Sequence, residues 1–236
     1  MMIKLGNFFF RYRNGLFPLA YLLLFCPGPQ LFNDYTLAVG LGLAIALLGQ
    51  LVRAVTIGLA YIIRGGKNRQ VYAEELVQEG IFAHCRNPLY VGNFLVLVGL
   101  GFLANSVLFL LIGVPFFLLA YLAIISAEEN YLRQKFGQQF DEYCARVPRI
   151  FPTFSGLRQT MHGMEFHWQR LIVKEYGSAY AWTTGALLLV LKHYWFDQKD
   201  ATGPVLVGTL LTCLVSVSLL YGLARYLKKA QVLRAE

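Results

Sequence analysis

The sequence predicts an all-α fold: a polytopic transmembrane helical bundle of about six spans, with both termini cytoplasmic and one cytoplasmic amphipathic helix. Of 236 residues, 57% are hydrophobic and only 14% are charged, and the mean hydropathy is +0.51. A soluble domain of this length carries far more charge. The apolar residues also gather in segments of roughly 20 residues, the length that crosses a bilayer. We therefore expect residues 1–236 to form a single integral membrane domain.

The expected spans follow one another along the chain with short polar breaks. The first contains Pro18 and runs into the Cys-Pro-Gly-Pro stretch 26–29, so we expect its outer end to be broken. Only Asn105 and Ser106 are clearly polar between the third and fourth spans, which predicts a tight hairpin of antiparallel neighbours. The six spans cover approximately residues 14–32, 36–63, 88–104, 106–126, 178–196 and 204–224.

Positive charge orients the expected bundle. Most of the 21 Lys and Arg residues lie before the first span, in the polar segments 64–87 and 127–177, or after the last span. Because Lys and Arg gather on the cytoplasmic side of a membrane, both polar segments should face the cytoplasm. The net charge of +8 then reflects membrane orientation, and we expect no nucleic-acid partner. The C-terminus carries no eukaryotic retention signal, which favours a bacterial inner membrane.

Residues 127–147 have the pattern of an amphipathic helix. Leu132 and Phe136 begin an apolar stripe at helical spacing, and charged residues lie off the stripe. This helix should lie against the membrane or the bundle, and Gly137 predicts a kink or a close contact in its middle. Prolines end the helix, and residues 153–177 are expected to be a loop with room for one short helix.

A polar motif at the start of the third span, residues 84–93, is the clearest candidate for chemistry. Asn87 before Pro88 is a helix-start signal, because proline disfavours the α conformation for the preceding residue and fixes its own φ for the first helical position. We expect the Asn87 side chain to cap the helix. An anion just outside this start would meet unpaired backbone N–H groups. His84 lies beside the motif and is a candidate base near neutral pH.

A carboxylate is expected against the membrane, where an unpaired charge is costly. Glu128 falls on the apolar stripe and therefore needs a cation. That cation is either a ligand group or a structural partner, Arg86 or Arg149. Its neighbour Glu129 is turned about 100° away and can pair with Arg133 four residues later.

Other polar and small residues suggest narrower roles. Arg53 lies deep in the second span, where it either serves function or only bonds helix carbonyls. Gly92, Gly99 and Gly101 predict close helix packing. The His and Glu residues of 162–167 and the four cysteines lack the spacing of a metal or disulfide framework, so we expect no metal site.

Two groups of residues follow each other in a fixed order over about residues 64–152. They are Leu76-Val77-x-x-Gly80-Ile81-Phe82 with Arg86-Asn87-Pro88-Leu89-Tyr90-x-Gly92, then Glu128-Glu129 with Leu132, Phe136-Gly137, Tyr143, Val147-Pro148-Arg149 and Pro152. In this order they resemble the isoprenylcysteine carboxyl methyltransferase family, which is integral to membranes, depends on S-adenosylmethionine and is related to phospholipid N-methyltransferases. The resemblance implies a methyltransferase core at 64–152. It gives no role to the loop and additional helical hairpin expected at 153–236.

The resemblance also implies where the cofactor binds. Glu128 would hold the ammonium group of S-adenosylmethionine, the aromatic face of Tyr90 suits its sulfonium, and Arg86 or the helix start suits its carboxylate. The catalytic candidates are His84, Arg86 and Tyr90. The residues carried over as cofactor-binding are Leu76, Val77, Phe82, Asn87, Pro88, Leu89, Tyr90 and Glu128.

Three departures from the family pattern bear on the polar contacts and the methyl acceptor. Asn87 stands for the usual histidine and Phe82 for the usual tyrosine. Ile124 stands where the similar eukaryotic enzymes have an arginine that serves the substrate carboxyl. We therefore expect methyl transfer to a lipophilic small molecule or lipid entering from the membrane, with the acceptor group left open among carboxyl, amine and thiol.

Two other functions remain open from the sequence. An NADPH-dependent membrane reductase acting on a sterol or enone is one, although segment 64–87 has few glycines and basic residues for a pyrophosphate. A small membrane transporter or assembly protein is the other, although no inverted repeat relates the two halves of the chain. The oligomeric state and the identity of the acceptor do not follow from the residues.

Overall fold

The structure, a computed structural model, describes residues 1–59, 64–67, 70–73, 75–196 and 203–233. The all-α fold class is confirmed, with one small β-hairpin among the described residues. The long helices are α1 (Met2–Tyr21), α2 (Tyr35–Leu59), α3 (Pro88–Leu103), α4 (Val114–Phe136), α7 (Trp168–Phe196) and α8 (Gly203–Lys229). The short elements are η1 (Leu22–Phe25), β1 (Arg64–Lys67), β2 (Gln70–Ala73), η2 (Gly80–Ala83), the π-helical turn η3 (Phe109–Gly113), α5 (Gln138–Arg146) and α6 (Leu157–His162).

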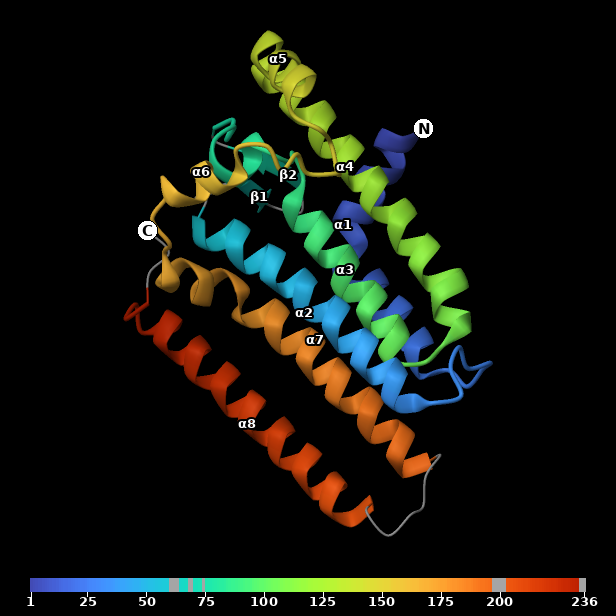
Figure 1. Ribbon diagram of the computed structural model, residues 1–236. Helices are drawn as coiled ribbons and strands as arrows, with labels where there is room; N and C mark the ends of the chain where they lie inside the picture. The colour runs from blue at the N-terminus through green and yellow to red at the C-terminus, as the bar shows by residue number, and fades with distance from the viewer. Residues whose placement is uncertain (60–63, 68–69, 74, 197–202, 234–236) are drawn as a thin grey trace.

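The long helices pack as one tilted bundle (Figure 1). Helix α2 lies along α3 and also contacts α7, α1 lies along α4, and α8 packs against α7 at the edge of the bundle. Helix α1 begins and α8 ends at the end of the bundle that also carries α5 and α6 (Figure 1). The motif at the start of α3 therefore lies at the same end as the segments that follow α4.

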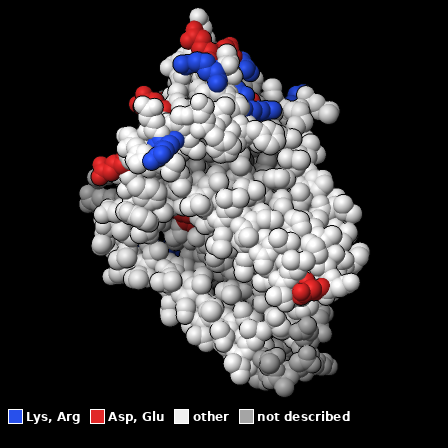
Figure 2. Space-filling model, in the orientation of Figure 1, with Lys and Arg blue, Asp and Glu red and all other residues white. Residues whose placement is uncertain are grey.

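The surface of the bundle is that of a membrane protein. Three helices of the described chain are long and apolar enough to cross a membrane: Tyr35–Leu59, Phe109–Phe136 and Val205–Lys229, and the shorter Pro88–Leu103 is also apolar. Figure 2 shows charged side chains gathered near α5, whereas most of the remaining face is uncharged. Exposed leucines such as Leu47 and Leu51 on α2 fit lipid contact. The chain is an integral membrane protein, and its six-span count and cytoplasmic termini stay predictions.

Two of the helix boundaries expected from the sequence are wrong, and a third lies outside the residues that the structure describes. The first helix begins at Met2 instead of residue 14, and ends at Tyr21 before a 3-10 turn. Residues 153–177 were expected to be a loop with room for one short helix; α6 is that helix, but α7 already begins at Trp168. Its first turns carry buried charges, which depress the hydropathy from which spans are identified. The expected last residues of the second span, 60–63, lie outside the described residues.

The hairpin between the third and fourth spans is confirmed as a tight turn. Asn105 adopts φ 50°, a left-handed conformation that asparagine tolerates better than most residues. Its Oδ1 accepts hydrogen bonds from the backbone N–H groups of Leu31 (3.0 Å) and Phe32 (2.9 Å). The turn therefore also fixes the loop between α1 and α2. Beyond the turn, α3 packs mainly on α2 and α4 on α1.

Residues 127–147 fold as two helices instead of one. Helix α4 runs to Phe136, Gly137 adopts φ 52°, and α5 starts at Gln138. The predicted disturbance at Gly137 is therefore a complete break, which glycine permits because it has no Cβ. The apolar stripe packs against the bundle, as Leu132, Phe140, Tyr143 and Val147 form one buried cluster.

Close packing through glycines is confirmed along α2 and α3. A Cβ built on Gly99 would lie 2.6 Å from the Gly42 carbonyl oxygen, and one on Gly92 would lie 2.8 Å from that of Gly49. A Cβ on Gly101 would instead meet Leu110 and Phe109 in the following turn. Small residues thus let the two backbones approach, which is how membrane helices gain packing energy.

We expect Gly49→Ala to destabilise the bundle by about 1–3 kcal/mol, because its Cβ would meet the Gly92 carbonyl oxygen at 2.6 Å. Gly40→Ala on the same helix is the matched control, since its Cβ meets nothing within 4 Å. Thermal unfolding of the two detergent-purified variants measures the difference. Equal unfolding temperatures would contradict the packing of α2 on α3 described above.

Candidate functional site

The motif at the start of α3 is tied to the segment that follows α5. The backbone N–H of Arg86 donates to the Pro148 carbonyl at 3.0 Å, and that of Thr153 donates to the His84 carbonyl at 3.0 Å. These bonds join residues more than sixty positions apart in the sequence. The two groups of motif residues identified from the sequence therefore lie side by side at one end of the bundle.

Asn87 precedes α3 as expected, but its side chain does not cap the helix. Helix α3 begins at Pro88, and Asn87 has φ −132° and ψ 50°. Its Nδ2 donates to the Arg149 carbonyl at 3.1 Å, and the residue is buried. The capping prediction is wrong because the amide is held by the neighbouring segment. Asn87 thereby adds a third link between the two halves.

His84 is held on both sides of its ring. Nδ1 lies 2.9 Å from the Thr153 carbonyl oxygen and Nε2 lies 2.8 Å from Thr160 Oγ1, so the buried imidazole joins the motif to α6. Its catalytic role stays a prediction. Next to it, the Cys85 thiol donates to the Ile150 carbonyl at 3.2 Å, and burial raises the pKa of this thiol. Cys85 therefore stays protonated at neutral pH and is a poor nucleophile.

Tyr90 and Glu128 meet across the site. The Tyr90 hydroxyl donates to Glu128 Oε1 at 2.9 Å, and Glu128 is only 8% exposed. The structural partners considered for Glu128, Arg86 and Arg149, form ion pairs with Glu129 instead. The buried carboxylate of Glu128 is thus oriented by a neutral phenol at the start of α3, next to an ion-pair cluster.

That cluster has two arginines around one carboxylate. Arg149 Nη2 lies 3.0 Å from one carboxylate oxygen of Glu129, and Arg86 Nη2 lies 3.6 Å from the other. The Nε atoms of both arginines are buried without a hydrogen-bond partner among the described residues. The cluster therefore carries one net positive charge and spare donors, which suit a carboxylate. The expected Glu129 to Arg133 pair is wrong, because Arg133 Nε bonds Asp141 at 2.7 Å.

The other residues predicted to bind a cofactor surround this region. Phe82 is buried, and its carbonyl accepts the Tyr143 hydroxyl at 2.8 Å, which ties η2 to α5. Leu76 packs against the buried cluster at the junction of α4 and α5. Val77 and Leu89 are half-buried. The structure thus gathers these side chains around the same end of the bundle, and their contact with a cofactor stays a prediction.

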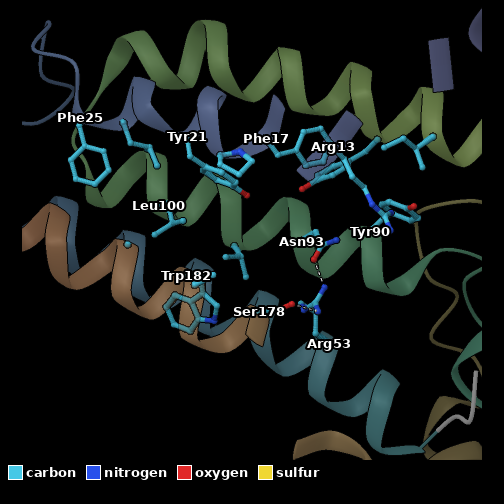
Figure 3. Close-up of a pocket in the computed structure, with 17 residues that line it drawn as sticks. Arg13, Phe17, Tyr21, Phe25, Arg53, Tyr90, Asn93, Leu100, Ser178 and Trp182 are labelled. Carbon is cyan, nitrogen blue, oxygen red and sulfur yellow. Dashed lines mark hydrogen bonds between the residues drawn. The ribbon is translucent and has the colours of Figure 1, made fainter. Parts of the chain in front are cut away.

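A cavity of about 570 Å³ opens beside Tyr90 inside the bundle (Figure 3). Its lining is mainly apolar and comes from α1, η1, α2, α3, α4 and α7. Ile124 lines it from α4, and Arg13 from α1. Sequence reasoning assigned no site role to the lining residues of α7, and it counted Arg13 only among the cations that precede the first span.

Arg53 lies on the cavity wall within a polar network (Figure 3). Its Nε and Nη2 donate to the two carboxylate oxygens of Glu175 at 2.7 and 2.5 Å, and Nη1 donates to Asn93. Gln50 donates to Glu175 at 3.0 Å and accepts from Trp182 Nε1 at 2.6 Å. The deep arginine thus bonds side chains of α3 and α7. Glu175 was missed because its segment was predicted to be a loop.

Comparison with known proteins connects this geometry to an enzyme family. Residues 34–139 match the family described as phospholipid methyltransferase. The nickel-cobalt-cadmium resistance protein NccN of Alcaligenes xylosoxydans xylosoxydans is 34% identical over 160 residues, which are 65% of this chain and 71% of that protein. The cobalt-zinc-cadmium resistance protein CzcN of Cupriavidus metallidurans is 34% identical over 158 residues, 64% of this chain and 68% of that protein.

A third relative is named as an enzyme. Protein-S-isoprenylcysteine O-methyltransferase of Schizosaccharomyces pombe is 31% identical over 119 residues, which are 47% of this chain and 48% of that protein. No solved structure matches the chain. The matched family segment ends at residue 139 and so leaves out α7 and α8.

We expect Glu129→Gln to cost about 2 kcal/mol of stability, because it leaves two arginines without their shared anion. The cost stays below that of a fully buried pair, since the Arg149 side chain is 36% exposed. Asp141→Asn is the matched control, because its ion pair with Arg133 is more than half exposed and should contribute under about 1 kcal/mol. Thermal unfolding separates the two, and an equal loss would refute the structural importance of the cluster.

Proposed function

Because the chain belongs to the family of membrane methyltransferases that includes phospholipid and isoprenylcysteine methyltransferases, we propose that it moves a methyl group from S-adenosylmethionine to a lipophilic acceptor. The observation that carries this proposal is the Tyr90 to Glu128 hydrogen bond of 2.9 Å. This hydrogen bond lies between the charged cluster around Glu129 and the apolar cavity, which Tyr90 also lines. Such a junction suits a polar methyl donor meeting a lipophilic acceptor.

The charged groups match the amino-acid end of the donor. An α-amino acid carries its ammonium and carboxylate on one carbon atom, and the site offers a buried carboxylate, Glu128, directly before Glu129 with its two arginines. Glu128 would hold the ammonium, and the spare Nε donors of Arg86 and Arg149 would take the carboxylate. The Tyr90 ring suits a sulfonium cation through its negative face. The remaining proposed contacts with the donor are Leu76, Val77, Phe82, Asn87, Pro88 and Leu89.

The protein's contribution to the reaction would be alignment and exclusion of water. The donor supplies a methyl group on a cationic sulfur, which leaves as a neutral thioether. Tyr90, fixed by Glu128, would hold the reacting end of the acceptor at the cavity mouth, and the apolar lining would keep water away. A carboxylate acceptor needs no base. For an amine or thiol acceptor, His84 and Tyr90 are the proposed proton acceptors. His84 would first have to exchange its bonds to Thr153 or Thr160, and Tyr90 would pass its own hydroxyl proton to Glu128 as it takes the proton of the acceptor.

The setting of the reaction follows from the same proposal. The charged end of the bundle would face the cytoplasm, where the donor is soluble, and the apolar cavity would receive its acceptor from the membrane. We propose a bacterial inner membrane for this arrangement. Incubation of the purified protein with donor labelled on the methyl group and a total membrane-lipid extract should give a labelled, lipid-soluble product. Absence of any labelled product would reject the proposed function.

We expect Glu128→Gln to weaken binding of S-adenosylmethionine by about tenfold or more, because a neutral amide cannot offset the ammonium charge. Glu142→Gln on α5 is the matched control, since this exposed carboxylate only accepts a bond from Gln138. Calorimetric titration of both detergent-purified variants gives the affinities. An unchanged affinity of Glu128→Gln for S-adenosylmethionine would contradict the assignment of Glu128 as the ammonium site.

The choice of cofactor has a separate test. S-adenosylmethionine should raise the unfolding temperature of the wild-type protein, whereas NADPH should leave it unchanged, because only a ligand that binds the folded state stabilises it. Stabilisation by NADPH alone would favour the reductase alternative raised by the sequence.

A further inference from the structure

Helix α7 presents one face to the cavity, and small residues dominate that face. Ser178, Ala181, Trp182 and Gly185 all line the cavity. They recur at the spacing i, i+3, i+4 and i+7, which places them on one side of a helix. Three of the four have small side chains, so the face leaves room beside the other helices. This wall belongs to a helix outside the matched family segment 34–139.

The wall is held in place by hydrogen bonds to α2. Trp182 donates to Gln50, Gln50 donates to Glu175, and Glu175 accepts from Arg53. Trp182 lies two helical turns after Glu175 on α7, and Gln50 lies one turn before Arg53 on α2. The chain of bonds therefore fixes the rotation of α7, and with it the residues that face the cavity.

The cavity is charged at one end and apolar at the other. In Figure 3, Arg13 and Tyr90 lie at one end and Phe25 at the opposite end, with Trp182 between them. The charge of Arg53 is offset by Glu175, whereas no acidic partner of Arg13 is found among the described residues. The Arg13 guanidinium lies instead over the Phe10 ring, 4.3 Å from its centre. Arg13 thus places a cation on the cavity wall at the end beside Tyr90.

Gly185 marks the part of the α7 wall farthest from Ser178. A Cβ built on Gly185 meets no heavy atom within 4 Å. A larger side chain at this position would therefore enter free space, and the cavity is the space that Gly185 lines. The missing side chain leaves volume for a ligand at the apolar end.

We propose that the cavity binds an amphipathic anion, with its charged head beside Arg13 and its apolar chain along α7, and that Gly185 sets how long that chain is. The assignment rests on the proposed function, since this ligand is the methyl acceptor or an analogue of it. Arg13, on α1, would supply the cation for the head, since the residues that α4 contributes to the cavity, Tyr121 and Ile124, carry no charge. The two C-terminal helices then gain a role, because α7 would select the acceptor by length.

Binding is measured without any methyl donor, through the fluorescence of Trp182. Trp168 and Trp195, both exposed, are replaced by Phe so that Trp182 is the only tryptophan. The probe is hexadecanoic acid brominated at its terminal carbon, because bromine quenches tryptophan at short range. The detergent-purified protein should show saturable quenching. Arg13→Gln should weaken binding of the acid but leave binding of the corresponding brominated alcohol unchanged.

Gly185→Leu tests the length limit, and Gly177→Leu is its control. Gly177 is also on α7, its Cβ also meets nothing within 4 Å, and it does not line the cavity. We expect Gly185→Leu to weaken binding of the hexadecanoic probe by about tenfold or more, since several methylene groups lose their site. Terminally brominated octanoic acid should bind equally well to both variants, because its chain is half as long.

The outcomes separate this inference from the proposed function. Equal affinities of the long probe for Gly185→Leu and Gly177→Leu, or no saturable quenching in the parent protein, would overturn the inference whatever the methyltransferase activity. Saturable, length-dependent binding in a protein that transfers no methyl group to any lipid would support the inference and reject the proposed function. Labelled lipid products together with equal affinities of the two variants for the long probe would support the proposed function and reject this inference.

Discussion

The ion pair of Arg53 and Glu175 constrains how the bundle is put together. A guanidinium deep in an apolar helix is costly unless an anion meets it, and a carboxylate with a 4% exposed side chain is costly for the same reason. Each charge therefore requires the other, which fixes α7 against α2. Asn93 of α3 also accepts from Arg53, so three helices share one polar centre. Arg53 and Asn93 also line the cavity, which therefore lies directly beside this polar centre.

The cost of a buried charge also explains why the adjacent residues Glu128 and Glu129 have different partners. Glu129 faces the segment after α5 and is neutralised by Arg86 and Arg149, so its role is to hold the two motif groups together. Glu128, turned toward α3, meets the Tyr90 hydroxyl. A phenol orients a carboxylate without cancelling its charge. Glu129 therefore ties the fold together, while Glu128 is the proposed site for the ammonium group of the donor.

The long helices and the proximity of the two motif groups were predictable from the sequence, whereas the hydrogen-bond and ion-pair partners of individual side chains were not. Apolar segment length located the long helices, and the Asn-Pro pair located the start of α3, because both signals are local. Three failures depended on contacts between distant segments: Asn87 bonds the Arg149 carbonyl, Glu129 takes Arg149 instead of Arg133, and α7 begins at Trp168. In the sequence, the charge of Glu175 lowers the local hydropathy, so its segment is predicted to be a polar loop. Only the fold shows that Arg53 pairs with Glu175.

The regions proposed to bind the donor and the acceptor are built in different ways, which bears on how such a protein could change its substrate. The proposed donor region consists of short segments locked by backbone and ion-pair contacts, and a substitution there disturbs several bonds at once. The proposed acceptor region is a cavity wall of single side chains from five helices and η1, of which Ile124, Arg13 and Gly185 can each change alone. If the chain has the proposed function, Arg13 on α1 would supply a cation to the acceptor without any change in the residues proposed to bind the donor. The choice of acceptor would then vary separately from the proposed methyl transfer.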